Sequence, residues 1–188
     1  MGHGGDVVRE LTADHEEMRE HFRDLSEVGD PASRRVLADR LTIALVRHCA
    51  AEEEHFYPAV RAHLDGGDLV ADKELADHAR AEALLKRLGE LDAGGPEFAR
   101  CLDELRTDVL AHLRDEEENL FPTLRHNCPQ PLLDDLGDRV RRAKRFGPTR
   151  PHPDGPATPP ANRIADPALG LVDRARDLVS GRGRRGRP

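Results

Sequence analysis

The stretch His48-Cys-Ala-Ala-Glu-Glu-Glu-His-Phe-Tyr-Pro58 recurs 64 residues later as His112-Leu-Arg-Asp-Glu-Glu-Glu-Asn-Leu-Phe-Pro122. In each copy a His is followed by Glu four and five residues later, and then by an aromatic residue and Pro. Side chains four residues apart share one face of an α-helix, so each imidazole and its carboxylate point the same way. Two such pairs facing each other supply nitrogens and bridging carboxylates, which suit iron or manganese better than zinc. The repeat therefore predicts a metal site between helices.

The repeat extends back to a lone histidine before each pair. His15 lies 33 residues before His48, and His78 lies 34 residues before His112. The chain thus consists of one helical hairpin used twice, each copy carrying a lone His and then a His-x-x-x-Glu pair.

Gly and Pro residues divide the sequence into four long helices. We expect them at residues 6–28, 31–64, 68–92 and 96–125, with Pro58 as a kink. Short connections make consecutive helices antiparallel neighbours. The predicted fold is all-α: an up-down-up-down four-helix bundle with a short extra C-terminal helix and a disordered tail.

Composition separates a folded domain from the tail. We predict that residues 1–145 form the bundle domain, with the extra helix at 131–145. Six of the 14 prolines lie between 146 and 163, so we expect the Pro- and Arg-rich segment 146–188 to be largely disordered, apart from a brief helix at 167–179. The domain has 21 basic and 32 acidic side chains against 8 and 4 in the tail. Its acidity argues against nucleic acid as a partner of the folded domain and leaves the partner of the tail open.

Cysteine usage and hydropathy indicate where the protein is located. Cys49, Cys101 and Cys128 are an odd number without metal-ligand spacing, which is typical of a reducing compartment. No apolar run approaches 18 residues, and no hydrophobic signal segment follows Met1. We therefore expect a cytoplasmic protein with no membrane span.

Histidines interrupt the hydrophobic stripes of the predicted helices. In the first helix His15 lies in a row with Val8, Leu11, Met18 and Phe22, at steps of three and four residues. Equivalent histidines of each hairpin lie at similar distances from its turn, so the four imidazoles form one layer of the bundle. Inward carboxylates in that layer need a cation, because buried charges are costly. The predicted metal ligands are His15, His48, Glu52, His78, His112 and Glu116. The glutamates expected on the solvated face are Glu53, Glu54, Glu117 and Glu118, and Glu53→Ala and Glu117→Ala should be nearly silent.

This pattern resembles that of the haemerythrin-like, or HHE cation-binding, family over about residues 6–126. The resemblance implies a non-haem centre of two iron ions, joined by an oxo or hydroxo bridge, inside a four-helix bundle. It implies that the histidines are terminal ligands and that Glu52 and Glu116 bridge the ions. The remaining coordination position would take O₂, peroxide, NO or solvent.

Some positions depart from the family pattern or adjoin it. Oxygen-carrying members have a second His four residues before the one equivalent to His78, where this chain has Glu74. Glu82 is a further candidate carboxylate. More oxygen donors favour the ferric state, so reversible oxygen carriage is not expected. His55 lies seven residues after His48 and is expected to face the site from just outside it, while Tyr57 is expected to pack at the bundle end or beside the metal.

The leading hypothesis is a di-iron protein that binds or reacts with O₂, peroxide or NO, with weak catalase- or peroxidase-like turnover left open. One alternative is a non-enzymatic sensor of oxygen, iron or redox state whose basic tail meets an anionic partner. Another is a ferritin-like iron oxidase or store, a design with two Glu-x-x-His pairs, of which only Glu52-x-x-His55 is present. A bundle without metal would leave Glu52 and Glu116 unexplained.

Overall fold

The computed structural model describes residues 4–152, 172–173 and 176–177 of the chain. This part of the protein is helical and contains no strand. Its elements are α1 (Val7–Glu27), α2 (Pro31–Ala51), η1 (Glu52–Phe56), α3 (Tyr57–His63), α4 (Gly67–Glu90), α5 (Pro96–Asp115), η2 (Glu116–Leu120), α6 (Phe121–Asn127) and α7 (Gln130–Phe146). None of the helices in the described ranges has the length and apolar character needed to cross a membrane.

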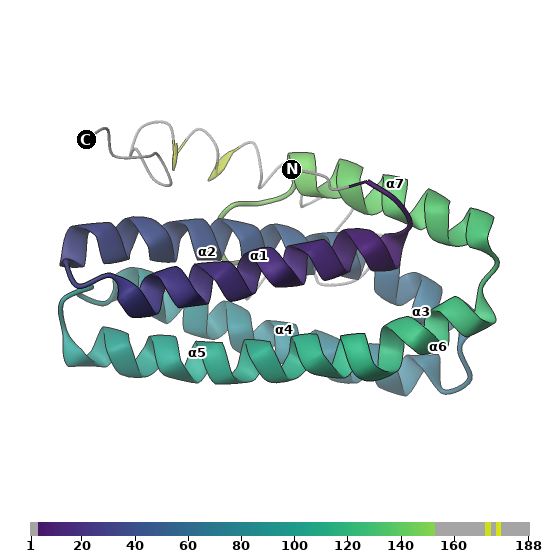
Figure 1. Ribbon diagram of the computed structural model, residues 1–188, viewed down its shortest axis with the longest axis horizontal. Helices are drawn as coiled ribbons and strands as arrows, with labels where there is room; N and C mark the ends of the chain where they lie inside the picture. The colour runs from purple at the N-terminus through teal and green to yellow at the C-terminus, as the bar shows by residue number, and fades with distance from the viewer. Residues whose placement is uncertain (1–3, 153–171, 174–175, 178–188) are drawn as a thin grey trace.

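Four helical rods lie side by side in an antiparallel bundle (Figure 1). The first is α1, the second is α2 continued by η1 and α3, the third is α4, and the fourth is α5 continued by η2 and α6. The all-α, up-down-up-down bundle predicted from the sequence is confirmed. The predicted extra helix is also present, since α7 packs outside the bundle against α1 and α2.

The helix starts follow from capping chemistry. The Asp30 carboxylate accepts hydrogen bonds from the backbone N–H groups of Ala32 and Ser33 at 3.0 and 3.2 Å, and Pro31 is the first residue of α2. A carboxylate at this position satisfies backbone donors that have no partner inside the helix. Asp6 caps α1 in the same way through Arg9 N at 2.9 Å.

Each His-x-x-x-Glu pair is followed at once by a π turn. The π segments η1 and η2 begin at Glu52 and Glu116, and the N–H groups of Tyr57 and Phe121 donate to the carbonyls of these two glutamates, five residues back. Pro58, which has no N–H to donate, is the second residue of α3, and α3 continues past it to His63. A π turn holds one extra residue, so it changes which side chains face the bundle interior beyond it.

A buried polar layer separates two hydrophobic clusters. Phe56, Tyr57 and Leu124 belong to the cluster on the α3, α6 and α7 side, and Leu41 and Phe98 belong to the cluster around the other ends of the rods. The buried polar side chains of the layer between them are Asp14, His15, His48, Glu52, Glu74, His78, His112 and Glu116. The two clusters exclude water from both sides of the layer.

The chain beyond α7 begins with a short buried segment. Gly147, Pro148 and Thr149 are buried, and the buried carboxylate of Asp173 accepts hydrogen bonds from the backbone N–H groups of Thr149 and Arg150, each at 3.0 Å. Most of the predicted linker at 146–163 and of the predicted helix at 167–179 lies outside the described residues.

The contact of α7 with the start of α1 leaves no room for a side chain at Gly137. A Cβ there would lie 2.6 Å from the Gly5 carbonyl oxygen, whereas a Cβ at Gly89 would meet nothing within 4 Å. We expect Gly137→Ala to lower the free energy of unfolding by about 1–3 kcal/mol, as overpacking does. Gly89→Ala should raise it by about 0.5–1 kcal/mol, because it replaces a helical glycine without a clash. Denaturant unfolding measures both, and wild-type stability of Gly137→Ala would contradict this packing.

Candidate metal centre

The structure brings all six predicted metal ligands together in the buried layer. Each rod contributes one histidine, and the two continued rods add Glu52 and Glu116, the first residues of the π segments. All six side chains are buried, with residue exposures between 0% and 8%.

The donor atoms form overlapping groups, each within 4.8 Å. One group contains His15, His48, Glu52 and Glu116; a second contains Glu52, His78 and His112; a third contains Glu74, His112 and Glu116. The histidines are paired across the bundle, with ring centroids 5.1 Å apart for His15 and His48 and 5.0 Å apart for His78 and His112. Glu52 is therefore grouped with both histidine pairs, and Glu116 is grouped with the first pair and with His112 of the second.

Each shared glutamate reaches one histidine of each pair. Glu52 Oε2 lies 3.1 Å from His48 Nε2 and 3.3 Å from His78 Nε2. Glu116 Oε2 lies 3.3 Å from His15 Nε2 and 3.8 Å from His112 Nε2. A carboxylate placed between two sets of nitrogens has the position of a bridging ligand.

Five inward-facing atoms of the layer make no hydrogen bond to the described residues. They are the Nε2 atoms of three histidines, which have only ion-pair contacts with carboxylate oxygens at 3.1–3.8 Å, and one oxygen of each glutamate: His15, His48, His112, Glu52 and Glu116. Buried polar atoms are costly when they are left unpaired, and native proteins rarely tolerate several in one place. Cations between the two histidine pairs would satisfy all of these atoms, so the residues present fit a metal centre.

Electrostatics in the layer couple imidazole and carboxylate strongly. Burial alone would lower the pKa of His48, but the carboxylates of Glu52 and Asp14 hold this pKa well above the ordinary value. Burial alone would raise the pKa of Glu52, but His48 and His78 keep it well below the ordinary value. A metal ion bound by His48 therefore has to compete with a proton for the same imidazole.

The outward nitrogen of every histidine in the layer meets a carboxylate. The Nδ1 contacts are His15 with Glu117 at 2.8 Å, His48 with Asp14 at 3.3 Å, His78 with Glu53 at 2.9 Å and His112 with Glu74 at 2.8 Å. An acceptor at Nδ1 fixes the ring so that Nε2 faces the centre, and it makes that nitrogen a better ligand. This double use of the imidazoles is typical of metal sites.

The expectation that Glu53 and Glu117 lie on a solvated face is wrong. Glu53 lies 2.9 Å from His78 Nδ1, and Glu117 lies 2.8 Å from His15 Nδ1. Burial raises the pKa of Glu117, but His15 and Arg19 lower it by more, to about 2. Glu53 and Glu117 occupy equivalent positions of the internal repeat, which could have indicated that they share a role at the site. Glu118 is exposed, as expected. Asp14 was not predicted, although the repeat offered a signal, because Asp77 precedes His78 as Asp14 precedes His15.

Glu74 orients a histidine from the outer side. One of its oxygens meets His112 Nδ1, and the other accepts a hydrogen bond from Lys73 at 3.0 Å. Glu74 also belongs to a group of possible ligands with His112 and Glu116. Glu82 belongs to none of the groups found among the described residues. Burial and the nearby charge of Glu53 raise the pKa of Glu82.

The π turn brings Tyr57 to the centre and turns His55 away. Five residues after Glu52, Tyr57 would lie about 140° around a regular α-helix, and the extra residue of the π turn reduces that angle. The Tyr57 hydroxyl lies 3.0 Å from His78 Nε2 and 3.1 Å from Glu116 Oε1. His55 is in none of the ligand groups found among the described residues and instead lines a pocket with Asp135 and Arg139 of α7, so its predicted orientation toward the site is not observed. Burial, followed by the charge of Glu116, raises the pKa of Tyr57 well above its ordinary value, which keeps the hydroxyl protonated.

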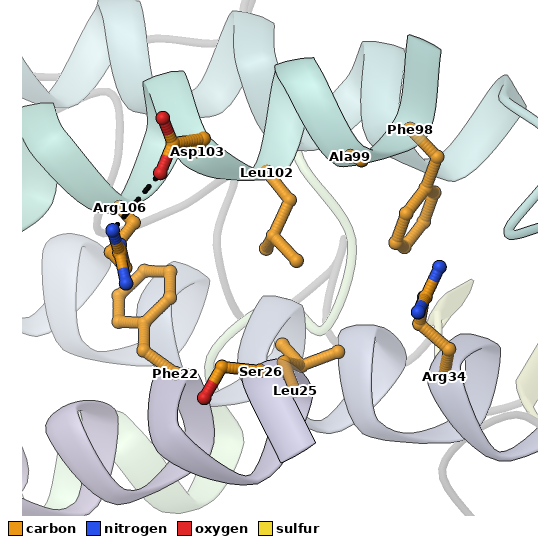
Figure 2. Close-up of a pocket in the computed structure, with 9 residues that line it drawn as sticks. All are labelled: Phe22, Leu25, Ser26, Arg34, Phe98, Ala99, Leu102, Asp103 and Arg106. Carbon is orange, nitrogen blue, oxygen red and sulfur yellow. Dashed lines mark hydrogen bonds and ion pairs between the residues drawn. The ribbon is translucent and has the colours of Figure 1, made fainter. Parts of the chain in front are cut away.

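A separate cavity of about 210 Å³ lies between α1, α2 and α5, toward the turn that joins α1 to α2 (Figure 2). Its walls are largely apolar, with Phe22 and Leu102 among the side chains that point into it. Asp103 is its one carboxylate and is paired with Arg106 at 3.0 Å. The cavity lining therefore lacks the second ligand that a metal ion would need.

Comparisons with known proteins agree with this geometry. The family model described as "Hemerythrin HHE cation binding domain" matches residues 6–124. An uncharacterised hemerythrin-like protein of Schizosaccharomyces pombe is 25% identical over 167 residues, which cover 88% of this chain and 82% of that protein. A DNA nickase of Nostoc sp. is 29% identical over 140 residues, 74% of this chain but only 38% of the nickase.

A solved structure shares the fold. The crystal structure of a hemerythrin HHE cation-binding domain-containing protein from Mycobacterium kansasii, an Rv2633c homologue, matches with a TM-score of 0.65 and 23% identity. The match covers 74% of this chain and 85% of that one. With the family match over most of the bundle and a buried His/Glu cluster in the expected layer, the chain belongs to the haemerythrin-like HHE cation-binding family.

Proposed function

We propose that the buried layer binds two iron ions. His15 and His48 would hold the first ion, His78 and His112 would hold the second, and Glu52 and Glu116 would bridge them. The observation that carries the proposal is that Glu52 and Glu116 each approach a nitrogen of both histidine pairs, in a layer where the inward nitrogens of His15, His48 and His112 make no hydrogen bond to the described residues.

The donor set favours iron over zinc. It consists of imidazole nitrogens and carboxylate oxygens, and structural zinc sites more often use thiolates in closed tetrahedra. The nearby thiol of Cys49 is buried, and burial raises its pKa, so it does not readily offer a thiolate. Shared carboxylates suit an ion that accepts more than four ligands.

The proposed function is binding of, or reaction with, O₂, peroxide or NO, including weak catalase- or peroxidase-like turnover. Two bound iron ions would supply the redox chemistry. The chain contributes a dry layer between two hydrophobic clusters and the protonated Tyr57 hydroxyl, which is placed to donate a hydrogen bond at the centre. The ferritin-like alternative loses support because His55 lines a pocket with residues of α7 rather than facing the centre with Glu52.

Iron binding should be lost on substitution of the bridging glutamates and weakened on substitution of the outer glutamates. Wild-type protein from iron-rich growth should hold about two iron ions, and Glu52→Ala or Glu116→Ala should lose them, because each removes a ligand of both ions. Glu53→Ala and Glu117→Ala should bind iron about 10–100-fold more weakly, since they release the outer nitrogens of His78 and His15. The exposed Glu118→Ala is the matched control and should be silent.

Elemental analysis after dialysis against increasing chelator concentrations distinguishes the variants of the bridging, outer and exposed glutamates. A stoichiometry of one ion would contradict the bridged arrangement, as would zinc that iron cannot replace. Equal metal loss from Glu118→Ala and Glu117→Ala would show that the assignment of the outer carboxylates is wrong.

The reduced protein should oxidise in air rather than carry oxygen reversibly. A centre rich in carboxylates stabilises the ferric state, and Glu74 stands where oxygen-carrying members of the family have a histidine. Stopped-flow absorbance after mixing reduced protein with O₂ should show a change that persists when oxygen is removed, and Glu52→Ala should show none. A spectrum that returns to the reduced form on deoxygenation would instead support oxygen carriage.

A further inference from the structure

A lysine from outside the four-helix bundle holds the carboxylate that orients His48. Asp14 Oδ2 lies 3.3 Å from His48 Nδ1, and Lys144 Nζ donates to both oxygens of Asp14 at 2.7 Å. Lys144 lies in α7, beyond residues 6–124, which the family model matches. Lys144 thus connects a fifth helix to the metal layer.

Burial explains why a cation from α7 lies here. Glu10 and Asp14 lie one helical turn apart on the same face of α1, with exposures of 0% and 6%, and Lys144 donates to both. Like charges at this spacing repel each other, and a buried carboxylate without a cation is strongly destabilising. Arg141 of α7 also reaches Glu10, at 3.4 Å, but no contact between Arg141 and Asp14 is present among the described residues. Lys144 is therefore the cation that α7 supplies to Asp14.

We propose that Lys144 is a positioning residue of the metal centre: it holds Asp14, and Asp14 fixes the His48 ring with Nε2 directed at Glu52. The proposal rests on the two-ion centre proposed above. It makes α7 a functional part of the site as well as a packing element.

Two other histidines are held in the same way from within the bundle. Arg19 donates to both oxygens of Glu117, which meets His15, and Lys73 donates to Glu74, which meets His112. A cation hydrogen-bonded to the carboxylate holds the carboxylate in place, so the imidazole keeps its orientation. With Lys144 behind Asp14 and Arg19 behind Glu117, both histidines of the first proposed ion have a carboxylate that is held by a cation.

The test compares variants of the full chain loaded with iron. In a chelator competition, Lys144→Met should release one of the two ions at about 10–100-fold lower chelator concentration than wild type, because only His48 loses its support. The optical spectrum of the oxidised protein should change with it. Lys144→Arg, which keeps the charge, should restore both properties. Asp14→Ala should weaken iron binding to the same extent. If Lys144→Met does not fold, Asp14→Ala alone tests the proposal.

Two controls separate positioning from packing. Glu10→Gln removes the other partner of Lys144 and should lower the melting temperature without changing iron affinity or the spectrum. Arg139→Met breaks an exposed ion pair on α7, with Asp135 at 2.6 Å, and should change neither property.

The outcomes separate this proposal from the proposed function. Two ions in wild type together with unchanged affinity and spectrum in Lys144→Met and Asp14→Ala would overturn the positioning role alone. Iron loss from Glu10→Gln as large as from Lys144→Met would also overturn it, because docking of α7 would then explain the effect. A wild-type chain that does not hold two ions would overturn the two-ion centre and this proposal with it.

Discussion

The structure depends on the burial of two carboxylates between two pairs of imidazoles. Glu52 and Glu116 are fully buried, and each lies within 3.8 Å of nitrogens from both pairs. Charges of this kind are tolerated inside a protein only when opposite charge and hydrogen bonds surround them. The hydrophobic clusters on either side remove water, so compensation has to come from the histidines and from the cations that we propose between them.

The same constraint explains the surrounding shell. Each imidazole uses its inner nitrogen for the centre and its outer nitrogen for a carboxylate, and three of the outer carboxylates have a cation behind them within the described part of the chain. The chain therefore surrounds the central charges with alternating layers of opposite sign. Rings held in this way are fixed before a metal binds, which reduces the cost of organising the site.

The sequence was sufficient to predict the bundle, its turns and the six central residues. Gly and Pro mark the helix ends, and the hydrophobic stripes place His15 and its counterparts inside, because both signals act through local geometry. Of the outer carboxylates, only Glu74 was singled out from the sequence, as a carboxylate where oxygen carriers have a histidine; Asp14, Glu53 and Glu117 were not predicted. Glu53 and Glu117 belong to acidic runs that resemble a solvated helix face, and Asp14 is paired with Lys144, which lies 130 residues away in the sequence.

The π turns were the other feature that simple periodicity could not provide. A regular helix would carry His55 toward His48 and Tyr57 away, whereas the extra residue in η1 reverses these orientations. Pro58 at the end of the first repeat suggested a kink in the helix. It did not indicate that the distortion would take the form of an inserted residue, because a kink also accommodates a missing N–H.

Anomalous X-ray diffraction at the iron edge, from crystals of the full chain grown with iron, tests the central claim most directly. The shared position of Glu52 and Glu116 predicts two anomalous peaks, no more than about 4 Å apart. One peak should lie between the inner nitrogens of His15 and His48 and the other between those of His78 and His112, with both glutamates in contact with both peaks. A single peak, or two peaks that do not share the glutamates, would contradict the account.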